Sequence, residues 1–294
     1  MEISIEIARK LIKEQFPEFS NLEIRWVEKN GHDNRTFYLG DNMSVRLPSG
    51  EKYASQIKKE MEWLPKLKQY ISCEIQSPIA NGKPSEIYPF PWSINKWIEG
   101  EVLSYHNINN LEDIAIDLAK FLKELQVIDA SDGPVAGAHN FYRGGLLKVY
   151  NDETINALNK LKDIFPTKDL KKIWEKALET KWDKEPVWVH GDVAVGNIIV
   201  RNGKLAAVID FGILGTGDPA CDYVMAWTFF DKRSRERFKQ ELMCDDETWD
   251  RAKGWALWKA LISYDVNNEN SDIVLKAKKT IYEILNDKNI YNFY

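Results

Sequence analysis

A histidine, two aspartates and an asparagine in the second half of the chain have a spacing that could support phosphoryl transfer. His190 and Asp192 follow the apolar run at residues 187–189, Asn197 comes shortly afterwards, and Asp210 begins an Asp-Phe-Gly sequence. Transfer to a hydroxyl needs a carboxylate that orients the hydroxyl and accepts its proton, and it needs oxygen ligands for Mg²⁺ on the phosphates. Asp192 fits the first role. Asn197 and Asp210 fit the second, which predicts a Mg²⁺-dependent reaction.

The segment between the asparagine and the second aspartate predicts a tight β-hairpin. Two apolar runs, residues 198–200 and 205–209, flank an Asn-Gly pair at 202–203, and both of these residues tolerate positive φ. A hairpin returns the chain to its start, so we expect the two ligands to lie together. A lone His-X-Asp sequence would be weak evidence for a catalytic loop. The same sequence followed in order by Asn197, the hairpin and the Asp-Phe-Gly sequence is much stronger evidence. We expect His190 to brace the loop by hydrogen bonds.

With these motifs, the chain resembles the aminoglycoside phosphotransferase family and, more distantly, the protein kinases. In that family the loop reads His-Gly-Asp, four residues, then Asn, and Val-Ile-Asp-Phe-Gly follows it; residues 190–197 and 208–212 fit this pattern. The stretch Gly-Asp-Pro-Ala-Cys-Asp at 217–222, with residues 88–93 and 97–101, extends the likeness to nearly the whole chain. The resemblance implies an α+β, two-lobed protein-kinase-like fold with a small β-sheet N-lobe and a larger, mainly helical C-lobe.

The resemblance also implies how the lobes divide the work. Residues 1–98 would form the nucleotide-binding lobe and residues 99–294 the catalytic and substrate-binding lobe. The hinge would lie near 95–100, with the nucleotide in the cleft. Backbone groups near Lys96 and Ile98 would then meet the base of ATP or GTP. The sequence does not distinguish these two donors, because backbone contacts leave no side-chain pattern.

The phosphate-binding residues depart from the kinase pattern, in which a strand lysine pairs with a helix glutamate. Arg46 stands at the lysine position, and its guanidinium can hold phosphate through two parallel hydrogen bonds; the alternative is an exposed strand arginine. Glu60 is the expected partner and Glu62 its rival. They lie about 200° apart on a helix, so only one can face the cleft. The loop at 28–34, with Gly31, is expected to cover the phosphates with its backbone N–H groups.

Two further aspartates follow the Asp-Phe-Gly sequence. In kinase-like proteins an aspartate in this region braces the catalytic loop by accepting hydrogen bonds from its backbone. Asp218 and Asp222 are both candidates. We favour Asp218 as the structural brace and leave Asp222 as a substrate-pocket residue.

The helical half holds the candidate residues for the acceptor. Six carboxylates could form an acidic rim for a polycation such as an aminoglycoside, although ordinary solvated helix faces account for most of them better. Trp255 and Trp258 share a helix face and are expected in the core, with stacking on a sugar or macrocycle as the alternative. Residues 133–150 resemble the inserted loop that shapes the acceptor pocket in the family. The six carboxylates are Asp132, Glu153, Asp222, Asp245, Asp246 and Asp250.

Periodicity and turn residues predict a mixed first part and a helical second part. The first part has helices at 1–16 and 53–70 and extended runs at 23–28, 35–39, 43–47, 75–78 and 94–97. The second part has helices at 111–125, 153–164, 169–180, 246–264 and 272–285.

Composition narrows the setting. The chain has 294 residues, 44% of them hydrophobic, and no apolar stretch approaches the roughly 20 residues that a membrane span needs. Three scattered cysteines fit a reduced cytoplasm better than a disulfide framework. A net charge of −5 argues against a nucleic-acid partner. We expect a cytoplasmic monomer or weak dimer.

Together these features predict a kinase that phosphorylates a small-molecule hydroxyl acceptor, foremost an aminoglycoside- or macrolide-like antibiotic. One alternative is a metabolic kinase that acts on choline, a fructosamine or another amino alcohol. Another is a catalytically silent nucleotide-binding module. Arg46 is the only sequence feature that supports the silent module, and the intact Asp192, Asn197 and Asp210 speak against it.

Overall fold

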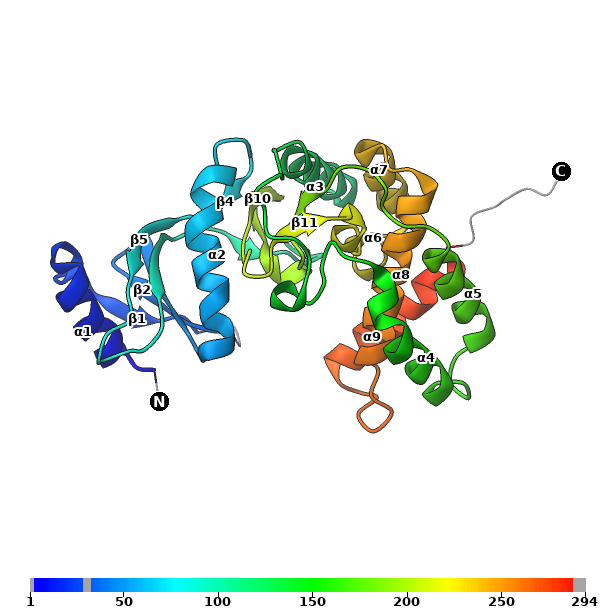
Figure 1. Ribbon diagram of the computed structural model, residues 1–294, viewed down its shortest axis with the longest axis horizontal. Coiled ribbons are helices and arrows are strands. Elements are labelled where there is room, and N and C mark those ends of the chain that lie inside the picture. The colour runs from blue at the N-terminus through cyan, green and yellow to red at the C-terminus, as the bar shows by residue number, and fades with distance from the viewer. Residues whose placement is uncertain (1–2, 29–32, 288–294) are drawn as a thin grey trace. The chain divides into compact units, whose positions relative to one another are not determined.

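The computed structural model describes residues 3–28 and 33–287, and they separate into two compact units (Figure 1). The N-terminal unit is built on small β-sheets and the C-terminal unit is mainly helical, so the predicted α+β fold is confirmed. No helix in the described residues is long and apolar enough to cross a membrane. The N-terminal unit comprises the described part of Met1–Val102, with Asn197–Arg201 and Leu205–Ile213; the C-terminal unit comprises Leu103–Gly196, Asn202–Lys204 and the described part of Leu214–Tyr294.

A five-stranded antiparallel sheet organises the N-terminal unit. Its strand order is β1-β2-β3-β6-β5. Phe37, Val45 and Ile94 are fully buried in its core, which α1 helps to cover. Helix α2 packs on β3, β5 and β6. The bounds are α1 Ile5–Gln15, β1 Ile24–Trp26, β2 Asn34–Leu39, β3 Met43–Pro48, α2 Glu51–Leu67, β5 Pro78–Gly82 and β6 Trp92–Lys96.

The strands of the predicted hairpin lie in a second sheet, with strand order β4-β10-β9-β7, and the turn at 202–204 belongs to the C-terminal unit. Asn202 and Gly203 both have positive φ, 55° and 74°, as a two-residue turn of this kind requires. The hairpin brings its ends together, because the N–H of Ile209 donates to the carbonyl of Asn197 over 2.9 Å. The bounds are β4 Glu74–Ile75, β7 Glu101–Val102, β9 Ile198–Arg201 and β10 Lys204–Val208.

Helix α8 is the centre of the C-terminal unit, with α4, α5, α6 and α9 packed against it (Figure 1). It is buried on nearly every side. The strands β8 and β11 pair antiparallel in the same unit. The helices are α3 Leu111–Gln126, α4 Asn151–Lys160, α5 Thr167–Leu178, α6 Met225–Thr228, α7 Lys232–Leu242, α8 Asp246–Ser263 and α9 Asp272–Asn286, and the strands are β8 Val187–Val189 and β11 Gly215–Gly217.

Asp245 begins α8 as its N-cap. Its carboxylate accepts hydrogen bonds from the N–H of Thr248 over 2.7 Å and from the ammonium of Lys184 over 2.9 Å. Partial burial alone would raise the pKa of Asp245, but these hydrogen bonds outweigh burial and lower the pKa to about 2. A carboxyl with a depressed pKa stabilises the fold above its unfolded pKa of about 4, and this contribution is lost as the pH falls toward 2.

We therefore expect Asp245→Ala to lower the free energy of unfolding by about 1 kcal/mol at pH 7. Asp245→Asn keeps an acceptor for Thr248 and should lose less. Urea unfolding at several pH values should show the deficit of the alanine variant shrinking below pH 4. If Asp245→Ala lowers the free energy of unfolding equally at pH 3 and pH 7, the charge of the Asp245 carboxylate does not contribute to the cap.

Candidate active site

Arg46 lies at the centre of a buried polar cluster in the N-terminal unit. Its Nη1 donates to Glu60 and to Gln76, each over 2.8 Å, and its Nη2 lies 3.5 Å from a carboxylate oxygen of Asp210. The Arg46 side chain is only 8% exposed, so the alternative of an exposed strand arginine is wrong. Glu60 is the ion-pair partner, whereas Glu62 is exposed on another face of α2. Burial alone would lower the pKa of Arg46, but the two carboxylates outweigh it and raise the pKa.

Sheet topology explains why Gln76 and Asp210 reach the same cluster. Strand β4 runs parallel to β10, with Ile75 opposite Val208. The residues that follow two parallel neighbouring strands leave the sheet at the same edge. Arg46 approaches this edge from β3, and Glu60 approaches it from α2. Four segments of the N-terminal unit thus converge on one guanidinium.

The backbone at Asp210 is held in an uncommon conformation. Asp210 has a φ of 66°, in the left-handed region that few residues other than glycine adopt. The N–H of Phe211 donates to Glu60 over 3.1 Å, so the glutamate that pairs with Arg46 also fixes this turn. A Cβ on Gly212 would lie 2.9 Å from the amide oxygen of Gln56, which favours glycine there. The Asp210 side chain remains 42% exposed.

Asn197 and Asp210 are suitable Mg²⁺ ligands by their chemistry. They carry an amide oxygen and a carboxylate oxygen, the hard ligands that Mg²⁺ prefers, and phosphate oxygens and water usually complete its coordination. Asn197 is partly exposed, and its carbonyl is tied to the residue before Asp210. The donor set and the hairpin geometry therefore fit the predicted ion.

In the C-terminal unit, the loop that follows β8 is braced by Asp222. Its two carboxylate oxygens accept from the N–H of His190 over 2.7 Å and from the N–H of Gly191 over 2.8 Å. Asp222 is fully buried. Burial raises its pKa, and His190 and the two N–H groups oppose that shift. Our choice of Asp218 as the brace is thus wrong, and Asp222 is not a pocket residue.

Asp218 has a different structural role. Its carboxylate pairs with Arg251 of α8 over 2.7 Å, and both side chains are buried. It also accepts from the N–H of Ala220 over 3.0 Å, which caps the short 3₁₀ helix Pro219–Asp222. Asp218 therefore ties the turn that carries Asp222 to the central helix, and it supports the loop indirectly.

His190 and Arg143 complete the support of the loop. His190 is buried, and its Nδ1 accepts from the N–H of Asp192 over 3.1 Å, which is the bracing role expected for it. The Nε of Arg143 donates to the carbonyl of Gly191 over 3.0 Å. Gly191 itself has a φ of 84°, a conformation that favours glycine. Asp192 is therefore presented by a loop that is held on several sides, and its own side chain is exposed.

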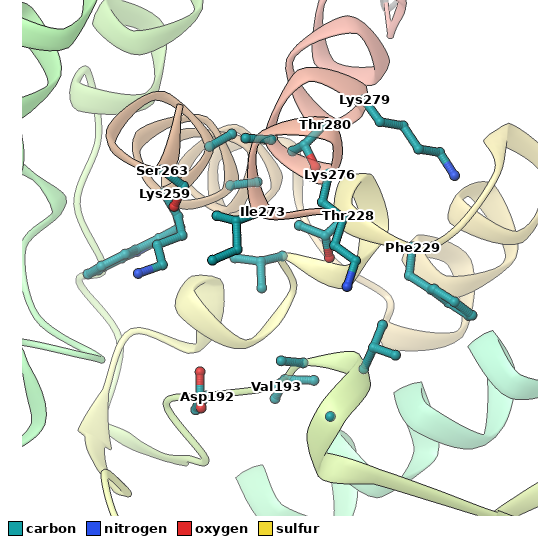
Figure 2. Close-up of a pocket in the computed structure, with 18 of the residues that line it drawn as sticks. Asp192, Val193, Thr228, Phe229, Lys259, Ser263, Ile273, Lys276, Lys279 and Thr280 are labelled. Carbon is teal, nitrogen blue, oxygen red and sulfur yellow. The ribbon is translucent and has the colours of Figure 1, made fainter. Parts of the chain in front are cut away.

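Asp192 borders a cavity of about 710 Å³ within the C-terminal unit (Figure 2). Trp255 and Trp258 of α8 form part of its wall, so these buried rings belong to both the core and the pocket. Tyr150 stacks on Trp258 with 3.7 Å between ring centroids, and the Arg143 guanidinium lies 5.0 Å from the same ring. Arg143 and Tyr150 both come from the segment predicted to shape the acceptor pocket.

None of the six candidate rim carboxylates is among the residues that line this cavity. Glu153 accepts from the indole N–H of Trp258, and Asp245 and Asp246 pair with Lys184 and Lys239. Besides Asp192 and Arg143, three charged residues that were not predicted from the sequence line the cavity. They are Lys259 on α8 and Lys276 and Lys279 on α9. Lysines that are far apart in the sequence, on two different helices, form no motif that would predict a shared pocket.

The other predicted nucleotide-binding residues are not tested by these contacts. Lys96 ends β6, and its ammonium lies 2.7 Å from Glu74. Ile98 is partly buried just beyond that strand. Gly31 lies outside the described residues. Contacts of Lys96 and Ile98 with a purine base, and of Gly31 with phosphates, stay predictions.

Comparison with known proteins is consistent with this site. The model of a phosphotransferase enzyme family matches residues 28–255, more than half of the chain. No protein of the curated set matches significantly.

Among solved structures, the GDP complex of aminoglycoside 2'-phosphotransferase-IIIa is 17% identical, with a TM-score of 0.72 over 96% of this chain and 98% of that one. The gentamicin complex of APH(2")-IIa is 21% identical, with a TM-score of 0.63 and 98% coverage of both chains. A macrolide 2'-phosphotransferase from Brachybacterium faecium is 14% identical, with a TM-score of 0.65 over 97% of this chain and 98% of that one. At these identities the likeness shows a shared fold.

Proposed function

The chain belongs to the phosphotransferase enzyme family, and we propose that it transfers the γ-phosphate of ATP or GTP, with Mg²⁺, to a hydroxyl of a small molecule bound beside Asp192. The observation that carries this proposal is the exposed Asp192 carboxylate on a braced loop at the wall of a cavity of about 710 Å³. A cavity of this size suits a drug-sized organic molecule. The chain is an enzyme, so the silent nucleotide-binding module is set aside.

Each residue has a separate task in this mechanism. Asp192 orients the acceptor hydroxyl and accepts its proton. Arg46, held by Glu60, contributes positive charge to the phosphates. Asn197 and Asp210 would hold Mg²⁺, which would neutralise charge on the phosphate oxygens. Orientation and charge neutralisation supply most of the rate, because a loose phosphoryl transition state needs little covalent help.

The cavity supports an apolar acceptor better than a polycation. The printed names of the structural neighbours include both aminoglycoside and macrolide phosphotransferases. Here the walls include two tryptophan rings, and Asp192 is the one carboxylate among the residues that line the cavity in the described chain. A polycation would meet three lysines and an arginine there. We therefore favour an acceptor with a large apolar body over a polycationic aminoglycoside and over small cationic amino alcohols such as choline.

Transfer of labelled phosphate tests the proposal directly. The full chain is incubated with Mg²⁺ and γ-labelled ATP or GTP, with erythromycin, kanamycin or choline as the acceptor. We expect label in a phosphate ester of erythromycin, the acceptor with the largest apolar body, and no label when Mg²⁺ is removed by a chelator. Absence of both phosphoryl transfer and nucleotide hydrolysis, in a protein shown to be folded, would refute the proposal.

We expect Asp210→Ala to weaken binding of the Mg²⁺–nucleotide complex by about 10- to 100-fold. Losses of this size are typical when a residue that supports a bound metal is removed. Titration calorimetry with and without Mg²⁺ measures the effect, which should be much smaller without the metal. Glu62→Ala is the matched control, because this carboxylate is exposed on α2 of the same unit. Equal losses with and without Mg²⁺ would remove Asp210 from the metal site.

A further inference from the structure

We propose that the acceptor carries an anionic group, a carboxylate or a similar acid, that is bound by Lys259 and Lys276. This inference rests on the proposed function and specifies its substrate class: a hydroxyl at one end, an apolar body, and an acid at the other end. The evidence is the charge and the wall chemistry of the cavity beside Asp192.

The charged side chains that line the cavity are unequal in sign. Among the described residues that line it, four side chains are cationic and one, that of Asp192, is anionic. Two of the cations have structural partners: Arg143 donates to the loop carbonyl of Gly191 and lies over the Trp258 ring, and Lys279 donates to the hydroxyl of Tyr105 over 3.1 Å. Of the two remaining cations, Lys259 has only the ring of Trp258 beside it, with 5.9 Å from its ammonium to the ring centroid, and Lys276 has no ion pair or hydrogen bond among the described residues.

Lys259 and Lys276 differ from many lysines of this unit. No carboxylate of the described residues lies within ion-pairing distance of either ammonium, whereas Lys184, Lys239 and Lys253 each have an acidic partner at 2.9 Å or less. Figure 2 shows Lys259 and Lys276 on helices α8 and α9, with their side chains extending into the space that faces Asp192 and Val193. Two cations that face one cavity repel each other, and an anion between them would remove that repulsion.

The apolar part of the cavity wall indicates the chemistry of the acceptor apart from its acid group. Trp258, the residue before Lys259, lines the cavity with an apolar ring. Ile273 offers apolar surface near the lysines, and Phe229 does so on another side of the cavity (Figure 2). Apolar walls lower the local dielectric constant and strengthen an ion pair formed against them. Asp192 would repel an acid placed next to it. The acid is therefore bound at the α8–α9 wall, which leaves the hydroxyl to face Asp192.

A matched series of ligands tests the charge preference without requiring turnover. Calorimetry on the full chain, without nucleotide, compares ω-hydroxydodecanoic acid with ω-hydroxydodecanamide and ω-aminododecanol. We expect the acid to bind at least about tenfold tighter than the amide, which corresponds to about 1.4 kcal/mol. The amine should bind more weakly than the amide. Lys276→Gln should remove most of the acid's advantage, and Lys276→Glu should reverse it in favour of the amine.

Lys278→Gln is the control, because Lys278 is exposed on the same helix and does not line the cavity. The inference is overturned if no ligand binds, if the amine binds as well as the acid, or if the control matches the effect of Lys276→Gln. Phosphoryl transfer is assayed separately. Transfer to an acceptor without an acid preference would preserve the proposed function and refute the inference. An acid preference without transfer to any hydroxyl would refute the function and preserve the anion site.

Discussion

Asp192→Asn should lower turnover by about 10³-fold and leave nucleotide binding nearly unchanged. An amide of almost the same size cannot accept the proton of the acceptor hydroxyl, and loss of such a general base typically costs about 10²- to 10⁴-fold. Because Asp192 is exposed and its loop is braced through backbone groups and Asp222, the substitution should change stability by less than about 0.5 kcal/mol. Steady-state kinetics and nucleotide titration measure the two quantities.

Asp132→Asn is the matched control, since it neutralises an exposed carboxylate of the same unit that does not line the cavity. Its turnover should stay within about twofold of the unmodified enzyme, as expected for an exposed side chain away from the active site. If Asp192→Asn turns over as fast as this control, Asp192 is not the general base. A parallel loss of nucleotide affinity would instead indicate a binding role.

The part of the site that sequence analysis recovered is encoded in neighbouring residues. Turn chemistry at Asn202-Gly203 predicts a hairpin wherever it occurs, and the hairpin then fixes which residues meet at its ends. Helical spacing separates Glu60 from Glu62, so only one of them was compatible with Arg46. In each case the geometry is determined by residues within a single helix or a single hairpin.

The part that sequence analysis missed depends on distant partners. Asp218 and Asp222 bound the same 3₁₀ turn, and nothing in their spacing shows which one faces the loop at His190. Arg251, far along the chain on α8, decides the question because it pairs with Asp218. Helix α7 was missed because its sequence is dominated by charged residues, and Phe238 is its only aromatic residue at a buried position.

The lysines of the cavity were missed for the same reason. Lys259 and Lys276 belong to different helices, and each is an ordinary exposed lysine within its own segment. Only the packing of α8 against α9 places them along one wall. The reaction chemistry is therefore local in this sequence, whereas acceptor recognition is a property of the assembled C-terminal unit.

Arg251→Met should destabilise the C-terminal unit by about 3–5 kcal/mol, the usual cost of removing one partner of a buried ion pair. The Asp218 carboxylate would stay buried without its cation. Burial already raises the pKa of Asp218 against the opposing effect of Arg251, so the pKa should rise further in the variant. A raised acid pKa means that the folded state holds a proton more tightly than the unfolded state. The deficit should therefore shrink as the pH is lowered toward the unfolded pKa of about 4.

Two further variants separate the buried charge from the loss of side-chain volume. Asp218→Asn combined with Arg251→Met removes the charge and keeps an acceptor for the N–H of Ala220, so it should recover a large part of the loss. Arg237→Met, at an exposed arginine of α7, should cost no more than about 0.5 kcal/mol. Urea unfolding of each variant gives the free energies. If the double variant is as unstable as Arg251→Met alone, packing of the arginine, and not the unpaired carboxylate, accounts for the loss; the turn that carries Asp222 would then be held to α8 mainly by shape.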